Sequence, residues 1–289
     1  MQGRTREPSL LYLGKFGKHM NFQLVPKIKN AKNLLLAYSP NLAQSWLLFV
    51  IVVLCHFAGF AVKAIVQYIP AVTPEWSQLL FDVSRYIVLA LVIVRFGKRG
   101  NDMPVIPARQ SPALWFLLVP LTLSVSITAV PLTMWIPRPD FFKQMFEDLS
   151  NINLPVFLSL VVIAPVCEEW LCRGIILKGL LKHYSPRKAI VWSSVIFGVV
   201  HFNPWQGVSA FFIGLAIGWI YWRTRSLRYC VFMHAVNNGT LFLLSFLFQD
   251  VHDDRSLADI AGGYYIYAVT FFVCVLCLLG TRKLFRSRV

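Results

Sequence analysis

Two adjacent carboxylates and a guanidinium interrupt a long apolar stretch of this sequence. Glu168, Glu169 and Arg173 lie within an apolar run over 154–181. A run of that length is typical of a membrane-spanning helix, which needs about 20 apolar residues. Charged side chains at such a depth cost roughly 2.5–3.5 kcal/mol each on insertion scales, so they persist mainly where they pair or act. The combination therefore indicates a functional site inside a membrane helix.

The two glutamates differ in what the helix offers them. Glu169 and Arg173 are four residues apart and can form an ion pair on one helix face. Glu168 points about 100° away around the helix and has no partner within it. A buried carboxylate of this kind is a plausible general base near neutral pH. Pro165, three residues before Glu168, is expected to bend the helix and to free backbone groups there.

Two further polar clusters follow in later apolar runs. Phe197-x-x-x-His201 and His234-x-x-x-Asn238 each place two side chains on one helix face, because residues four apart are neighbours. Measured from the flanking basic residues, Glu168, His201 and His234 lie roughly 15, 20 and 9 Å into a ~30 Å apolar core. We therefore expect the three clusters to line one cavity.

The composition indicates which elements must position these residues. The chain of 289 residues is 57% hydrophobic and only 14% charged, whereas soluble domains average about 25% charged residues. Its mean hydropathy is +0.60. The sequence predicts an all-α fold, a polytopic membrane helix bundle with about eight transmembrane helices. The expected spans are 43–69, 79–96, 113–136, 154–181, 189–202, 206–222, 229–248 and 263–279.

The basic residues predict the orientation of this bundle. With eight spans, both termini lie on one side, and 22 of the 28 Lys and Arg residues fall on that side against three in the opposite loops. The positive-inside rule therefore predicts cytoplasmic N and C termini. We expect a basic cytoplasmic or interfacial tail at 1–42, the transmembrane bundle at 43–281 and a second basic tail at 282–289. The cavity would then open to the cytoplasm.

The net charge of +15 is explained by this topology. The basic residues cluster in loops, which predicts contact with a lipid bilayer that carries anionic headgroups. No basic stripe with interleaved aromatic residues is present, so we expect no nucleic-acid partner. The predicted localisation is an integral, multi-pass membrane protein, in the plasma membrane if the source is bacterial.

Other polar residues within the spans are expected to be structural. Arg85 can pair with Asp82 three residues earlier, and Lys63 can extend toward the membrane interface. His56 is expected to be a satisfied core histidine. The six cysteines lie within apolar runs, and even Cys274-x-x-Cys277 is expected to pack rather than to bind zinc or to form a disulfide.

The three clusters, in this order on separate spans, closely resemble the motifs of the CPBP family of intramembrane proteases. This family comprises the CAAX proteases and bacteriocin-processing enzymes and is also called Abi. The EExxxR motif occurs at 168–173, FxxxH at 197–201 and HxxxN at 234–238. The resemblance covers about 154–248, the expected catalytic core. It implies an intramembrane endopeptidase that acts on a membrane-associated, prenylated or leader-bearing peptide or protein.

The resemblance also implies a role for each motif residue. By analogy, Glu168 would activate a water molecule with the help of His201. His234 and Asn238 would stabilise the oxyanion of the tetrahedral intermediate, and Arg173 would orient the second glutamate. The implied catalytic residues are Glu168, Glu169, Arg173, His201, His234 and Asn238.

The use of a metal is left open by the sequence. Glu168, His201 and His234 could supply the three protein ligands of a catalytic zinc ion. However, no HExxH motif is present and each ligand comes from a different span, so zinc and metal-free glutamate chemistry stay equally open. Ser193 and Ser194 lie near His201 in the chain but lack the G-x-S context of a serine hydrolase.

Two functions of other classes also stay open. One is a catalytically silent membrane scaffold or bacteriocin-immunity protein, against which the complete set of polar motifs argues. The other is a proton-coupled transporter, in which intramembrane Glu and His would relay protons. No inverted repeat, the usual sign of a transporter, is visible in the sequence.

Overall fold

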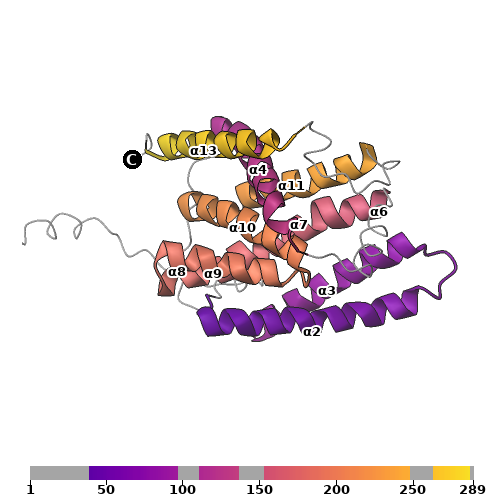
Figure 1. The fold of residues 1–289 in the computed structure, drawn as a ribbon. Helices are drawn as coiled ribbons and strands as arrows, with labels where there is room; N and C mark the ends of the chain where they lie inside the picture. The colour runs from indigo at the N-terminus through magenta and orange to yellow at the C-terminus, as the bar shows by residue number, and fades with distance from the viewer. Residues whose placement is uncertain (1–38, 97–110, 137–152, 248–262, 287–289) are drawn as a thin grey trace, which may run out of the picture.

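The computed structural model of the protein contains helices and turns and no strands among the residues that it describes, which are 39–96, 111–136, 153–247 and 263–286 (Figure 1). This confirms the predicted all-α class, and each of the eight predicted spans coincides with one helical stretch. These stretches are α2 (Leu42–Val66), α3 (Pro74–Phe96), α4 (Pro112–Thr133), a continuous helix over 154–183, α9 (Pro186–Val199), α10 (Pro204–Thr224), α11 (Leu227–Leu247) and α13 (Tyr265–Arg286).

Five of the described helical stretches are long and apolar enough to cross a membrane: Leu42–Val66, Pro74–Arg95, Pro112–Thr133, Leu154–His183 and Tyr265–Phe285. Helices α9, α10 and α11 do not meet that standard. With 14 residues, α9 extends only about 21 Å, less than the ~30 Å apolar core of a bilayer. Eight transmembrane spans and cytoplasmic termini remain predictions, because the N-terminal tail and most charged loops lie wholly or largely outside the described residues.

Helix boundaries differ from the expected ones where a capping residue or a proline sets them. The second span begins at Pro74, five residues earlier than expected, because proline favours the first turn of a helix and Glu75 is favourable there. At α2, Asn41 and Gln44 form a reciprocal capping box. The last helix, α13, continues to Arg286, so the segment predicted as the C-terminal tail begins inside a helix.

The fourth span is not a uniform α-helix. It consists of α6 (Leu154–Phe157), the π-helical segment η2 (Leu158–Ile163), α7 (Ala164–Glu169), a second π-helical segment η3 (Trp170–Leu177) and α8 (Lys178–His183). π-helical turns are rare and occur frequently at functional sites. The adjacent glutamates of the first motif therefore lie between two widened segments of one helix.

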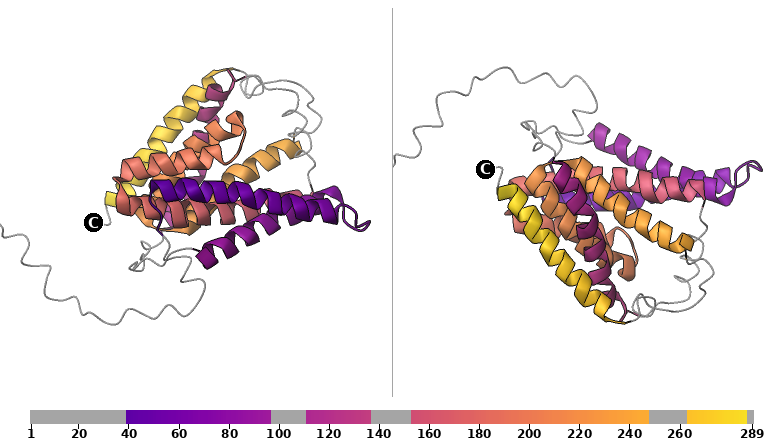
Figure 2. Two further views of the ribbon diagram at one scale, coloured as in Figure 1. Left: turned by 90° about the horizontal axis from the view of Figure 1, so that it is seen from below. Right: turned by 90° about the horizontal axis from the view of Figure 1, so that it is seen from above.

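The helices pack around this fourth span. The α2–α3 hairpin lies on one side of the bundle and contacts the fourth span through α3, while α13 packs against α4 on the opposite side (Figures 1 and 2). α9 packs on α10, and their backbones approach closely: a Cβ added at Gly198 would lie 2.7 Å from the carbonyl oxygen of Gly207. Glycine at this crossing brings the end of α9 close to α10.

The described core is apolar and contains free thiols. Leu118, Ile175, Leu177 and Ile217 are fully buried at its centre. All six cysteines are free, and each is buried or partly buried, as the sequence predicts for packing cysteines.

Candidate active site

Pro165 determines how the fourth span meets α11. In the π-helical pattern the carbonyl of Leu160 would accept from the amide of residue 165, but proline has no amide hydrogen. The side chain of Asn238 supplies the missing donor, because its Nδ2 lies 2.9 Å from the carbonyl oxygen of Leu160. The predicted freeing of backbone by Pro165 thus has a specific structural consequence: it anchors the HxxxN motif to the first motif's helix.

A cavity of about 400 Å³ lies where α2, α3, the fourth span, the α9–α10 turn and α11 meet. Four of the six predicted site residues line it: Glu168, His201, His234 and Asn238. The prediction of a shared cavity therefore agrees with the geometry. The other two, Glu169 and Arg173, lie behind it and are fully buried.

Glu168 presents one carboxylate oxygen that has no partner. Its Oε1 accepts a hydrogen bond of 2.8 Å from the hydroxyl of Tyr86 on α3. Its Oε2 is buried and has no hydrogen-bond partner among the described residues. Glu168 has no ion partner within its own helix, as expected, but the tertiary structure provides it with a tyrosine. The unpaired Oε2 belongs to a cavity-lining side chain and is available to accept a proton.

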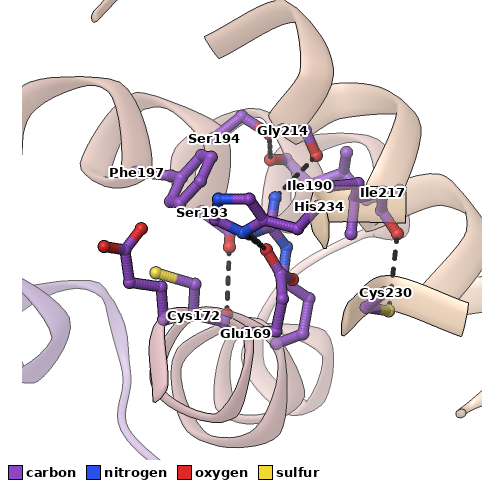
Figure 3. A network of polar contacts seen from close by, with 12 residues as sticks. Glu169, Cys172, Ile190, Ser193, Ser194, Phe197, Gly214, Ile217, Cys230 and His234 are labelled. Carbon is purple, nitrogen blue, oxygen red and sulfur yellow. Dashed lines mark hydrogen bonds and ion pairs between the residues drawn. The ribbon is translucent and has the colours of Figure 1, made fainter. Parts of the chain in front are cut away.

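Glu169 is held by an ion pair and does not line the cavity, although its Oε2 is likewise buried without a hydrogen-bond partner among the described residues. Its Oε1 forms the predicted ion pair with Nη1 of Arg173 at 2.8 Å, and both side chains are fully buried. The same oxygen lies 2.9 Å from Nδ1 of His234, a contact that the sequence does not predict (Figure 3). Arg173 also donates to the carbonyl of Gly214 at 3.1 Å and lies over the ring of Phe197. These contacts orient Glu169 and join four helices behind the cavity: the fourth span, α9, α10 and α11.

The hydrogen bonds of the two histidines determine which ring nitrogen is free. His201 Nδ1 lies 2.7 Å from the carbonyl oxygen of Phe197, so Nδ1 is the protonated nitrogen and Nε2 is left as an acceptor. His234 Nδ1 faces Glu169 Oε1, so it likewise carries a hydrogen. The ring of Phe197 packs edge-on against both histidines, with its centroid 5.1 Å from that of His201 and 5.5 Å from that of His234.

His201 does not lie within a helix, which corrects the predicted span of 189–202. α9 ends at Val199, and His201 lies in the turn that leads to α10. Phe202 adopts a left-handed conformation with φ of 56°, and the Asn203 side chain accepts from the amide of Gln206 to cap α10. The helix ends here because the chain must reverse before Pro204, whose ring restricts the preceding residue to an extended conformation.

A short polar chain also supports Asn238. Asn237 Nδ2 donates to Asn238 Oδ1 at 3.0 Å, and the hydroxyl of Ser126 on α4 lies 2.6 Å from Asn237 Oδ1. One hydrogen of the Asn238 amide goes to Leu160, and the other is not used by these bonds. Asn238 therefore retains one donor.

The α2–α3 hairpin contributes cavity residues that the motifs do not indicate. The predicted ion pair between Arg85 and Asp82 is present at 2.9 Å. His56 is satisfied, as predicted, by contacts with the Val52 carbonyl and with Arg85, but it also lines the cavity. Sequence reasoning missed Tyr86. The available signal was the pair of charged residues just before it in an apolar span.

Two further sequence expectations bear on this hairpin and on the serines. Lys63 donates to Gln78 on α3 at 2.8 Å, within the helix pair. The hydroxyls of Ser193 and Ser194 donate to the backbone carbonyls of Cys172 and Ile190, and neither serine lines the cavity (Figure 3). The structure thus adds nothing in favour of a serine nucleophile.

The three candidate zinc ligands satisfy only part of what a metal site requires. His201 and His234 each leave Nε2 free, and Glu168 leaves Oε2 free, which are suitable donor atoms. However, no group of three His, Cys, Asp or Glu side chains is close enough to hold a metal ion among the described residues. In this arrangement the donor chemistry fits zinc and the spacing does not.

The comparisons with known proteins agree with the motifs. Residues 150–240 match the family model described as "Type II CAAX prenyl endopeptidase Rce1-like". No curated protein and no solved structure matches the chain. The matched region contains all three motifs and extends from the fourth span into α11. Residues 150–240 are therefore a domain of the Rce1-like type II CAAX prenyl endopeptidase family.

Proposed function

We propose that this protein is an intramembrane endopeptidase that hydrolyses a peptide bond of a membrane-associated substrate with water activated by Glu168. The observation that carries the proposal is the free Oε2 of Glu168, a buried carboxylate oxygen of a residue that shares one cavity with His201, His234 and Asn238. A carboxylate with one oxygen held and one oxygen free is suited to bind a water molecule and to accept its proton.

The hydrolytic step follows from the free atoms. Glu168 Oε2 accepts one hydrogen of the water, and His201 Nε2 accepts the other, which orients the oxygen toward the carbonyl carbon of the substrate. Proton transfer to Glu168 accompanies formation of the C–O bond. The tetrahedral intermediate then breaks its C–N bond, and Glu168 returns the proton to the departing amine. Its carboxylate is regenerated for the next cycle.

Asn238 and His234 stabilise the oxyanion in this proposal, but with different requirements. Asn238 uses the second hydrogen of its amide, because the first is donated to Leu160. His234 already directs its Nδ1 hydrogen to Glu169, so it donates from Nε2 only as a doubly protonated imidazolium. Glu169 would stabilise that cation. Each oxyanion donor is worth about 2.7–4 kcal/mol in a preorganised site.

The cavity also suits a substrate with an apolar chain. Its wall combines the polar residues above with apolar side chains such as Val52, Leu79, Val156 and Leu241. A prenylated CAAX protein or a leader-bearing peptide carries a lipid or an apolar segment beside the bond to be cut. We propose substrates of this class, which reach the site from the membrane.

The test is cleavage by the purified protein in liposomes. Prenylated and unprenylated versions of one CAAX peptide are incubated with the native protein and with Glu168→Gln, and the products are identified by mass spectrometry. Cleavage by the native protein alone supports the proposal. Comparative membrane proteomics of cells that carry native protein or Glu168→Ala would then reveal uncut natural precursors. If the folded native protein cleaves no candidate, the scaffold or immunity function is favoured instead.

A metal-dependent reaction is the second candidate, because Glu168, His201 and His234 offer suitable donor atoms, although they would have to lie closer together than in this structure to hold an ion. Glu168, His201 and His234 would hold the ion, which would supply Lewis-acid activation of the water. The test adds a chelator to the cleavage assay. The metal would be favoured if the chelator abolishes turnover and added zinc restores it. In that case the native protein should also retain a stoichiometric amount of zinc, and His201→Ala should not. Turnover that persists in metal-free protein would favour the glutamate mechanism.

A further inference from the structure

Tyr86 connects the α2–α3 hairpin to the carboxylate of the first motif. The two residues are 82 positions apart in the chain, and Tyr86 lies outside the region that matches the family model. Its hydroxyl is 2.8 Å from Oε1 of Glu168. It is the one hydrogen-bond contact seen for that carboxylate among the described residues.

The direction of this hydrogen bond is determined by Arg85. Nη2 of Arg85 lies 3.1 Å from the Tyr86 hydroxyl and can only donate to it. The guanidinium also lies over the tyrosine ring, 4.5 Å from the centroid. Since the hydroxyl accepts from Arg85, its single hydrogen goes to Glu168. Donation to a hydroxyl strengthens the bond that the hydroxyl donates in turn.

Arg85 is itself held in place from three elements. It forms an ion pair with Asp82 at 2.9 Å and donates to His56 Nε2 on α2 at 2.6 Å. Asp82 accepts a further hydrogen bond from Ser159 of η2. The tyrosine is therefore the end of a polar chain that begins at His56 of α2 and is also bonded to the fourth span at Ser159.

We propose that Tyr86 is a positioning residue for the hydrolysis. It holds Oε1 of Glu168 so that Oε2 remains free toward the cavity, and Arg85 holds Tyr86. The inference rests on the proposed function, in which Glu168 is the general base. The carboxylate would otherwise rotate about its side-chain bonds, and a base displaced by about 1 Å can lose about 100-fold in rate. Positioning should therefore appear in kcat and not in KM.

The experiment compares Tyr86→Phe with a matched tyrosine elsewhere. Tyr229 is fully buried, and its hydroxyl accepts from the amide of Ser111 at 2.9 Å, away from the cavity. Tyr229→Phe removes one buried hydrogen bond without touching Glu168. We measure kcat, KM and the melting temperature of both variants in liposomes or detergent, beside Glu168→Gln.

We expect Tyr86→Phe to lower kcat by up to about 100-fold at unchanged KM. Tyr229→Phe should lower the melting temperature and leave kcat unchanged per folded molecule. If Tyr86→Phe yields too little folded protein, Arg85→Lys is the second variant, because it keeps a cation beside Asp82 but loses the planar fork that reaches Tyr86. It should lower kcat in the same way, by a smaller factor.

The outcomes separate this inference from the function on which it rests. A native kcat for folded Tyr86→Phe or Arg85→Lys beside an inactive Glu168→Gln overturns the positioning role alone. Equal losses of kcat in Tyr86→Phe and Tyr229→Phe also overturn it, because they would show a general effect of stability. Turnover retained by Glu168→Gln overturns the proposed function and this inference with it.

Discussion

Glu168 and Glu169 are neighbours in the chain, yet the structure places them in contrasting surroundings. Glu168 lines the cavity with one oxygen bound to Tyr86 and the other free. Glu169 is fully buried behind the cavity, where Arg173 and His234 share one of its oxygens. Oε2 of each glutamate is buried without a hydrogen-bond partner among the described residues, so the two differ in the ion pair and in the cavity. A buried carboxylate becomes a candidate base where it borders a cavity instead of being paired with a cation. A carboxylate that is buried in an ion pair holds other residues in place.

The largest expected effect comes from neutralising the cavity-side carboxylate. Glu168→Gln should lower turnover by about 10²–10⁴-fold, the usual contribution of a general base. The melting temperature should change little, because glutamine retains an oxygen for Tyr86 and removes a desolvated charge. Cleavage in liposomes and a melting curve measure the two effects. Native turnover in Glu168→Gln with inactive but folded Glu169→Gln would reverse the comparison, and native turnover in both variants would exclude a glutamate base.

Removing Arg173, the ion-pair partner of Glu169, should lower the stability of the fold, whereas Glu168→Gln should lower turnover alone. Arg173→Ala leaves Glu169 buried without its cation, at a typical cost of roughly 3–5 kcal/mol of unfolding free energy. Lower expression and a lower melting temperature are expected, together with loss of activity. Denaturant titration of the purified variant measures the change. An unchanged melting curve would contradict the structural role assigned to this side of the helix.

Asn238 has a proposed catalytic role, as an oxyanion donor, and a structural role, as the donor to the Leu160 carbonyl. A double variant can separate the two roles. Asn238→Ala should lower turnover by about 10²–10³-fold through the lost oxyanion donor, and stability by about 1–3 kcal/mol because the Leu160 carbonyl loses its donor. Pro165→Ala supplies an amide that can bond that carbonyl within the helix. The pair Pro165→Ala and Asn238→Ala should therefore recover stability and remain inactive. Recovery of turnover in the double variant would show that Asn238 is structural only.

The smallest effect is expected from removing the Ser126 hydroxyl, which supports Asn238 through Asn237. Ser126→Ala removes the hydroxyl that lies 2.6 Å from Asn237 Oδ1, which should cost about 0.5–1.5 kcal/mol of stability. Turnover should fall slightly, since Asn237 in turn contacts Asn238. Ser194→Ala is the control, because its hydroxyl bonds a carbonyl of its own helix away from the cavity. A larger loss of turnover in Ser194→Ala than in Ser126→Ala would contradict the proposed support of Asn238 by Ser126 and Asn237.

The features that could be predicted from the sequence are those set by local spacing and composition. The apolar runs predict the helices, and four-residue or three-residue spacing predicts the ion pairs of Glu169 with Arg173 and of Asp82 with Arg85, which the structure contains. The three motifs also predict the family of residues 150–240. These inferences succeed because residues one turn apart on a helix are neighbours wherever the helix lies.

The tertiary structure alone decided which residues the site receives from distant helices. Tyr86 meets Glu168 across 82 positions, His234 meets Glu169 across 65, and Asn238 meets the Leu160 carbonyl across 78. Such contacts depend on how the helices rotate and cross, which side-chain packing determines and periodicity does not encode. The π-helical segments beside Pro165 add to this, because they change the face that each later residue of the fourth span presents. Periodicity therefore indicated the candidate site residues, and packing decided which of the two adjacent glutamates lines the cavity.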